Sequence, residues 1–376
     1  MRVDGCASVL LDAHEQLAIF PCPRVLRGLL RSDGYERVTR CCALYLIRWL
    51  RAPLRWRERR MRKNGDKEHA MEKPSYKDFC FAGNGSFDLA SLPTNLQVPE
   101  SCKDKIVKEM AKNIKKIAKL QGKLYADWRE GVVVLIQAMD AAGKDGTIKH
   151  VFSGVNPQGV EVTSFKTPSK EELLHDYLWR AVKALPARGK IGVFNRSYYE
   201  DVLVVKVHEM QRGYTMAPRN IDQDTKDFFE QRYRQIKDFE RYLDENSYRV
   251  VKIFLNVSRE EQHARFLSRI DAQKKNWKFS AGDLAESDLW PQYMDAYQQV
   301  IYRTSTKAAP WYVIPADQKF VARYLVSQLI KDVLEDIDPK YPELSDEGIA
   351  QMQELRPTLI GVAVQDEQQG NAKECE

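Results

Sequence analysis

Apolar and polar positions alternate along the chain in stretches that predict strands and helices in turn. An unbroken apolar run at Val132–Ile136 is short and β-branched, which is typical of a strand buried on both faces of a parallel sheet. A loop of small residues follows it, and Thr147 is expected to open a helix. Further strands are predicted at residues 160–165, 190–194, 248–257 and 311–314.

Amphipathic stretches between these strands predict helices. The longest, residues 101–128, carries an apolar stripe opposite a lysine-rich face. Ser169 and Ser258 each precede a glutamate by three residues, the spacing of a capping box that starts a helix. The first of these helices is expected to end near Ala184. Other helices are predicted at residues 224–243, 293–304 and 317–334.

Strands that alternate with helices indicate the α/β fold class, with a right-handed parallel sheet between two layers of helices. Residues 76–100 are rich in loop signals, and residues 271–290 are polar and irregular. From Tyr341 onward the chain has eight acidic residues and only two basic ones, which predicts a flexible tail. The chain is therefore divided into an extension at 1–72, a folded domain at 73–340 and an acidic tail at 341–376.

Charge is concentrated at the N-terminus. The whole chain of 376 residues has a formal charge of +6, but residues 1–70 hold 15 Lys and Arg against 8 Asp and Glu. The remainder is close to neutral, so the charge does not imply general affinity for nucleic acid. The basic run Arg48–Lys63 could contact RNA or lipid headgroups. Alternatively, residues 1–70 are a disordered arm or lie upstream of a natural start at Met71, and this second interpretation is favoured.

A chain that begins at Met71 is therefore expected to keep the full activity and thermal stability of the complete chain, because the predicted fold starts after that residue. Activity assays and thermal unfolding of the two forms side by side test this expectation. A loss of either property in the shorter form would contradict it.

Cysteine and apolar content suggest the cellular setting. The seven cysteines include no C-x-x-C pair, which supports neither a zinc site nor a disulfide framework and is typical of a reducing cytoplasm. No apolar run is long enough to span a membrane, because the run at Cys41–Leu50 is short and broken by Arg48. Acidic residues near the N-terminus argue against a signal peptide.

The loop after the first strand has the parts of a phosphate cradle. Small residues lead to Gly143-Lys144 and then to a helix, so that backbone N–H groups and a lysine can face an anion. The match to G-x-x-x-x-G-K-[ST] is imperfect, since Ala138 replaces the first glycine and Asp145 replaces the Ser or Thr that would bind magnesium. Asp140 in the same loop would repel phosphate unless a divalent cation lay between them, which predicts that it is a Mg²⁺ ligand.

Two more segments carry candidate chemistry. Asn195 and Arg196 follow a predicted strand, and the carboxyl ends of parallel strands meet where ligands bind. The Asn195 amide could take a water of the metal or a phosphate oxygen, and the Arg196 fork suits phosphate. Downstream, cations interleaved with aromatic residues suggest a mobile lid at about 258–300 that brings positive charge over a transferring phosphoryl group. Its cations are Arg265, Arg269, Lys274, Lys275 and Lys278.

Three separated segments resemble the family-2 polyphosphate kinases. They are Gln137–Lys149, Phe194–Val202 and Arg265–Asp271 with Asn276–Ser280, within a likeness that runs from about Pro74 to Pro342. The resemblance implies a three-layer α/β/α phosphate-loop kinase fold with a helical lid. It also implies that inorganic polyphosphate and Mg²⁺, or Mn²⁺ in its place, phosphorylate AMP or ADP to give ADP or ATP.

The resemblance also assigns roles to residues. Asp140 and Asn195 would flank the metal ions, Lys144 would hold phosphate, and Arg196 with Arg265 would stabilise the transferring group. The other residues expected to contact phosphate or nucleotide are Ala141, Ala142, Gly143, Asp145, Gly146, Thr147, Lys149, Lys166, Glu200, Arg269 and Lys278.

Departures from the commonest family pattern suggest a subclass. Ala138 replaces a glycine, and Asn195-Arg-Ser-Tyr-Tyr-Glu200 replaces an Asp-Arg-Ser-Trp-Tyr-Asn type of sequence. These variants look like the class that accepts both AMP and ADP, with Glu200 suspected of favouring AMP. Two alternatives stay open: an ATP-dependent nucleoside monophosphate kinase, and a non-catalytic polyanion or RNA binder. A cytoplasmic homo-oligomer, dimer or tetramer, that binds neither nucleic acid nor membrane is expected.

Overall fold

The computed structural model describes residues 73–278 and 280–373, without the side chains of Lys278, Ala281 and residues 361–373. The expectations for residues 1–72 lie outside this part and stay predictions. Among the described helices none combines the length and the apolar character that crossing a membrane requires.

Six strands form one sheet in the order β1-β6-β5-β2-β4-β3. All neighbouring strands are parallel except β1 and β6. This confirms the predicted parallel sheet, but the two-residue strand β1 at its edge was not predicted, because two residues are too short to show a pattern. The strands are β1 (Cys80–Phe81), β2 (Gly131–Ala138), β3 (Val160–Ser164), β4 (Ile191–Asn195), β5 (Tyr248–Asn256) and β6 (Trp311–Pro315).

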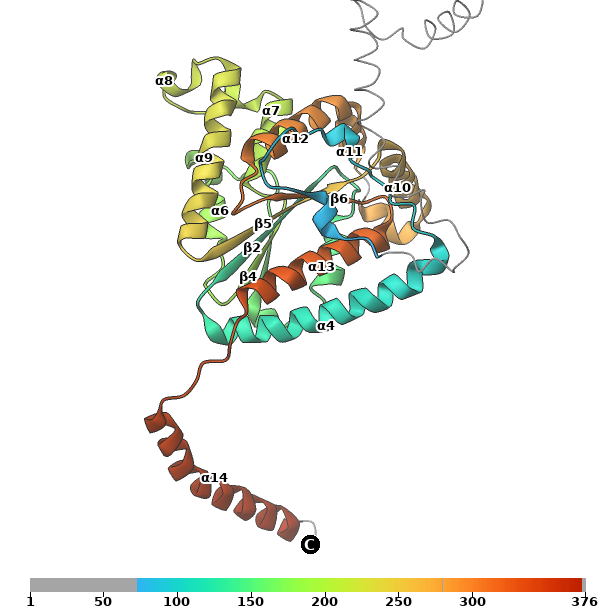
Figure 1. The fold of residues 1–376 in the computed structure, drawn as a ribbon. Coiled ribbons are helices and arrows are strands. Elements are labelled where there is room, and N and C mark those ends of the chain that lie inside the picture. The colour runs from blue at the N-terminus through green and yellow to red at the C-terminus, as the bar shows by residue number, and fades with distance from the viewer. Residues whose placement is uncertain (1–72, 279, 374–376) are drawn as a thin grey trace, which may run out of the picture. The chain divides into compact units, whose positions relative to one another are not determined.

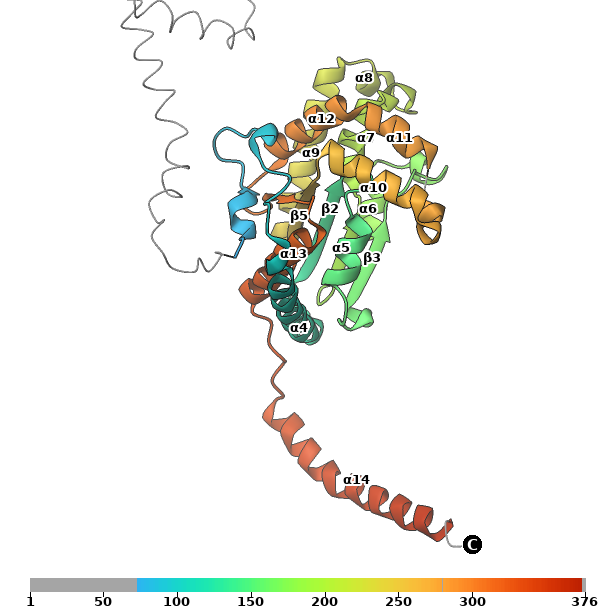
Figure 2. The same cartoon turned by 90° about the vertical axis from the view of Figure 1, so that its right-hand side faces the viewer.

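Helices cover both faces of this sheet. Figure 1 shows α4 and α13 on one side and α9 and α12 on the other, and Figure 2 shows α5 beside β2 and β3. The predicted three-layer arrangement is therefore confirmed. The α-helices are α4 (Lys103–Asp127), α5 (Lys144–Val151), α6 (Trp179–Lys183), α7 (Val204–Val207), α8 (Pro218–Ile221), α9 (Thr225–Glu245), α10 (Arg259–Asp271), α11 (Ala281–Asp288), α12 (Trp290–Thr304), α13 (Lys319–Ile337) and α14 (Asp346–Lys373).

The core lies where these layers meet. Every residue of β2 is buried, and α4 packs its apolar stripe against α13. Strand β2 is central in the sheet, because β4 pairs with it on one side and β5 on the other, in register from Val132 onward. At the carboxyl ends, Ile136 of β2 stands opposite Asn195 of β4. This register brings the loop after β2 next to the residues that follow β4.

The prediction of one helix from Ser169 to about Ala184 is wrong. The capping box forms, since Ser169 N donates to Glu172 Oε2 at 2.7 Å and Glu172 N donates to Ser169 Oγ at 3.2 Å. Only a 3₁₀ turn at Glu172–Leu174 and the short helix α6 follow. Leu173 and Leu174 are 57% and 83% exposed, so no buried apolar face supports a longer helix.

Two segments predicted to be irregular are more regular than expected. The stretch 271–290 contains a 3₁₀ helix at Gln273–Lys278 and then α11, which Ser280 caps by accepting from Gly282 N at 3.2 Å. The predicted tail contains the helix α14, with Pro357 inside it. The residues from 349 to 360 are exposed, so burial of an apolar face does not account for this helix.

Candidate active site

The loop between β2 and α5 is the segment that the sequence predicts to be a phosphate cradle. Gly143 stands just before α5 with φ +109°, and Ala141 also has a positive φ of +59°. Glycine suits the first position because side chains disfavour that backbone region. The helix therefore starts at Lys144, three residues before the predicted start at Thr147. The first N–H groups of α5 have no acceptor within the helix and can face an anion.

Lys144 is buried at the base of this loop. Its side chain Nζ donates to the carbonyl oxygens of Ala138 at 2.7 Å and Met139 at 3.2 Å, and it lies 3.9 Å from Asp140 Oδ1. Burial, reinforced by the positive charge of Arg196, lowers the pKa of Lys144 to about 8. The lysine thus sits where the sequence placed it, with a proton that it holds less tightly than an exposed lysine does.

Arg196 connects the two loops at the carboxyl ends of β2 and β4. Its guanidinium donates to Asp140 Oδ1 at 2.6 Å and to Glu200 Oε2 at 3.0 Å. Burial by itself would lower the pKa of Arg196, but the carboxylates of Glu200 and Asp140 outweigh it and hold that pKa above its usual range. Arg196 also adopts a positive φ of +64°, which a residue with a side chain adopts only when its surroundings hold it there.

The two expected metal ligands do not touch each other in this structure. Asn195 donates through its amide nitrogen to Asp145 Oδ1 at 2.8 Å, and Asp140 is bound to Arg196. Within residues 73–278 and 280–373 no group of three or more His, Cys, Asp or Glu side chains could hold a metal ion. The oxygens of Asp140 and Asn195 still fit Mg²⁺, because this ion keeps several waters and takes only one or two carboxylates beside substrate phosphates.

Arg265 binds the backbone of the loop between β2 and α5. Its guanidinium donates to the carbonyl oxygens of Ala141 at 3.1 Å and Ala142 at 2.5 Å, and it reaches those of Ala316 and Asp317 from the other side. The side chain is 6% exposed and pairs with Glu261 at 2.7 Å. Helix α10 therefore lies against the cradle, as a lid would, but the Arg265 fork is engaged with backbone oxygens.

The other predicted lid and substrate residues are more scattered. Arg269 pairs with Asp283 of α11 at 2.8 Å. Lys149 and Lys166 are exposed, and the Lys166 carbonyl accepts from Arg180 at 2.8 Å. The Lys278 side chain lies outside the described part of the chain, so its role stays a prediction.

Sequence reasoning missed two cations on α13. Lys319 and Arg323 are one helical turn apart, and Arg323 lies 3.2 Å from the ring of His150 on α5. Burial and then the charge of Arg265 lower the pKa of both residues. In the part of the chain that the structure describes, neither pairs with a carboxylate. The sequence contained a signal for Lys319. A basic residue in the first turn of a helix is unfavourable to the helix dipole, so its presence there suggests a functional role.

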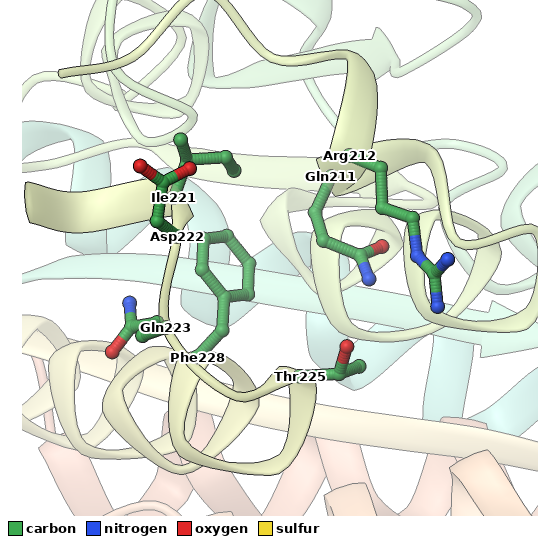
Figure 3. Close-up of a pocket in the computed structure, with 7 residues that line it drawn as sticks. All are labelled: Gln211, Arg212, Ile221, Asp222, Gln223, Thr225 and Phe228. Carbon is green, nitrogen blue, oxygen red and sulfur yellow. The ribbon is translucent and has the colours of Figure 1, made fainter. Parts of the chain in front are cut away.

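A pocket of about 250 Å³, shown in Figure 3, has a different lining from this cluster. It contains none of the predicted site residues. Gln211 is buried in its wall, and neither its amide oxygen nor its amide nitrogen has a partner among the described residues. The lining residues are Gln211, Arg212, Ile221, Asp222, Gln223, Thr225 and Phe228. The candidate active site is therefore the open cluster at the strand ends and not this pocket.

Comparison with known proteins agrees with the geometry. Residues 100–342 match the family model of Polyphosphate kinase 2 (PPK2). The chain is 45% identical to an ADP-polyphosphate phosphotransferase of Rhodopseudomonas palustris, over 76% of this chain and 98% of the relative. It is 41% identical to an AMP/ADP-polyphosphate phosphotransferase of Meiothermus ruber, over 69% of this chain and 93% of the relative.

A solved structure is similar as well. The crystal structure of Polyphosphate Kinase 2 from Arthrobacter aurescens TC1 superimposes with a TM-score of 0.68 at 38% identity, covering 76% of this chain and 97% of that one. This confirms the phosphate-loop α/β fold that the sequence motifs implied. By its motifs, its fold and its relatives, the chain belongs to the polyphosphate kinase 2 family.

Proposed function

We propose that this protein transfers the terminal phosphoryl group of inorganic polyphosphate to AMP, ADP or both, with Mg²⁺. The observation that carries the proposal is the cluster of Lys144, Asp140 and Arg196 at the carboxyl ends of β2 and β4. It combines two cations with one carboxylate at the mouth of a loop shaped for phosphate. The activities for which the relatives from Rhodopseudomonas palustris and Meiothermus ruber are named agree with it.

The residues would divide the work of a phosphoryl transfer. One P–O bond to the polymer breaks while a bond to an oxygen of the nucleotide phosphate forms, so that negative charge shifts between them. The α5 amides and Lys144 would bind the donor, and Arg196 would bind the transferring group. Asp140 and Asn195 would hold Mg²⁺, which neutralises phosphate charge when bound, and Mn²⁺ could replace it. No histidine is required, because positioning and charge neutralisation supply the catalysis.

Arg265 would contribute from its buried place. Because its fork binds the carbonyls of Ala141 and Ala142, it would set the shape of the cradle and add positive charge beneath it. Direct contact with the transferring group would require a rearrangement of α10, which a closing lid could provide. Arg269 would have to leave Asp283 in the same movement.

Acceptor choice would depend on Glu200. Its carboxylate lies 3.0 Å from Arg196, so it can influence how that arginine meets an acceptor phosphate. The relative from Meiothermus ruber is described as acting on AMP and ADP, and the one from Rhodopseudomonas palustris as acting on ADP. We propose that this chain accepts both, with Glu200 favouring AMP.

An assay of donors against acceptors tests the proposed function. Purified protein and Mg²⁺ are mixed with polyphosphate or ATP as the sole donor, and with AMP, ADP, GMP or GDP as acceptor. Product is expected from polyphosphate with AMP and ADP. Product from ATP and AMP alone would instead support a nucleoside monophosphate kinase. No product from any pair, together with RNA binding, would favour the polyanion binder.

The α13 cations are expected to bind the part of the polymer that lies beyond the cradle. Replacing Lys319 and Arg323 together with alanine should raise the KM for long polyphosphate by about tenfold, since one exposed and one partly buried cation, neither with a carboxylate partner among the described residues, would be lost. The KM for nucleotide should change little. Steady-state kinetics at low and high salt measure both values, and the difference should shrink as salt screens the charges.

A matched control is available on α4. Lys115 and Lys119 are also four residues apart, exposed and without a carboxylate partner among the described residues. Their double alanine variant should leave the KM for polyphosphate unchanged. An equal effect in the two double variants would show that general charge, and not a binding path along α13, is responsible.

The lowered pKa of Lys144 predicts a pH dependence. Below pH 8 the lysine of the free enzyme is charged, and as pH rises through about 8 it loses its proton. The kcat/KM for polyphosphate should therefore fall above about pH 8, approaching tenfold per pH unit, because kcat/KM reports groups of the free enzyme. A pH profile measures this fall, and a constant value up to pH 10 would contradict it.

A further inference from the structure

A buried ion pair lies beneath the loop that carries Arg196. Lys252 of β5 donates to Glu240 Oε2 of α9 at 2.6 Å, and the two side chains are 0% and 2% exposed. Lys252 also donates to the Thr304 carbonyl at 2.8 Å and approaches the Tyr199 hydroxyl at 3.3 Å. The ammonium group thus has a partner for each of its three hydrogens.

The second oxygen of Glu240 binds two tyrosines of that loop. Glu240 Oε1 accepts from the Tyr198 hydroxyl at 3.0 Å and from the Tyr199 hydroxyl at 2.6 Å. Both rings are buried. Burial, and then the charge of Glu240, raises the pKa of each tyrosine well above its usual value, so both remain protonated donors. One carboxylate therefore anchors two consecutive residues.

These anchors lie next to the catalytic groups in the chain. The 3₁₀ helix Tyr198–Val202 starts two residues after Arg196, and Glu200 is inside it. Ser197 between them accepts from Tyr199 N at 3.2 Å and from Gln137 Nε2 of β2 at 3.0 Å. The loop is held from the sheet and from α9 at once, which explains how Arg196 keeps its positive φ.

We propose that Tyr198, Tyr199, Glu240 and Lys252 are positioning residues for the phosphoryl transfer. They fix the backbone from 196 to 200 so that Arg196 stays between Asp140 and Glu200. A buried ion pair is a poor source of stability compared with apolar side chains of the same size, so fixing this loop is a better account of its presence. The inference rests on the proposed role of Arg196.

The test removes the two hydroxyls and leaves the ion pair intact. In a Tyr198→Phe/Tyr199→Phe variant, Glu240 and Lys252 still neutralise each other, while Glu240 Oε1 loses both of its donors and Lys252 loses one of its three acceptors. The kcat is expected to fall by at least about tenfold with a change in KM below about twofold, because a displaced Arg196 weakens the transition state more than substrate binding. If the double variant does not fold, Tyr199→Phe alone is measured, with the same expectation.

Tyr76→Phe is the matched control. Tyr76 is also buried, and its hydroxyl also donates to a carboxylate, that of Asp332 at 2.9 Å, away from the site. This control should keep its kcat and lose less thermal stability than the double variant, because Asp332 is partly exposed and keeps Lys331 at 2.8 Å. Hydrogen exchange of the amides from 196 to 203 should become at least about tenfold faster in the double variant and stay unchanged in the control.

A double-mutant cycle separates this inference from the proposed function. In an Arg196→Ala background the tyrosine substitutions should lower kcat no further, since the residue they position is gone. A kcat within twofold of the unaltered protein, or unchanged exchange of residues 196–203, would overturn the positioning role. If Arg196→Ala itself kept full activity, the proposed role of Arg196 would fail, while the exchange result would still report whether the tyrosines hold the loop.

Discussion

Replacing Lys144 with alanine is expected to lower kcat by about a thousandfold or more, which corresponds to about 4 kcal/mol of lost transition-state stabilisation. The lysine is the buried cation at the base of the cradle, within 3.9 Å of Asp140. At a buried position a charge acts strongly on developing phosphate charge, since the local dielectric is low. No neighbouring cation can replace it, because Arg196 and Arg265 are held by their own partners.

The fold should survive this substitution. Asp140 keeps its bond to Arg196, so no carboxylate is left buried without a partner. Only the buried carbonyls of Ala138 and Met139 lose a donor, and a water in the space left by the lysine side chain would replace it. Thermal unfolding and steady-state kinetics test the prediction, with Lys115→Ala on the exposed face of α4 as the control. Turnover close to that of the control would contradict the assigned role.

The parallel sheet was predictable largely because its central strands β2 and β4 are buried on both faces. Such strands are continuous apolar runs, and in β2 and β4 the run ends at a change to polar or small residues. The long helix α4 was predictable for a related reason, since its stripe is repeated over many turns. The segment 169–184 shows the limit. A capping box indicates where a helix can start, but burial of an apolar face determines how far the helix continues.

The site was partly predictable from the sequence for a topological reason. Parallel strands place their carboxyl ends at one edge, so residues that follow two neighbouring strands meet without any knowledge of loop geometry. Asp140, Lys144 and Arg196 meet in this way. The partners of Arg265 were not predictable, because the carbonyls of Ala316 and Asp317 come from a loop far along the chain. The contact between Glu240 and Tyr199 was not predictable either, because Glu240 lies on α9, in a layer of helices beside the sheet.

Replacing Asp140 with asparagine is expected to lower kcat by about a hundredfold to a thousandfold and to raise the Mg²⁺ concentration needed for half-maximal rate. The substitution keeps the shape of the side chain but removes the charge that attracts the ion. An amide oxygen is a weaker ligand, and Asn195 as the other proposed ligand brings no charge either. Arg196 would retain Glu200 at 3.0 Å, so the loop should stay folded.

The control for this variant is at the opposite end of β2. There Arg249 lies between Glu130 at 3.1 Å and Asp336 at 2.8 Å, as Arg196 lies between Asp140 and Glu200. Glu130→Gln therefore removes one carboxylate from an arginine that keeps another, and it should alter neither kcat nor the Mg²⁺ requirement. If Asp140→Asn lowered kcat with an unchanged Mg²⁺ requirement, Asp140 would act by orienting Arg196. Unchanged kcat would exclude both roles of Asp140.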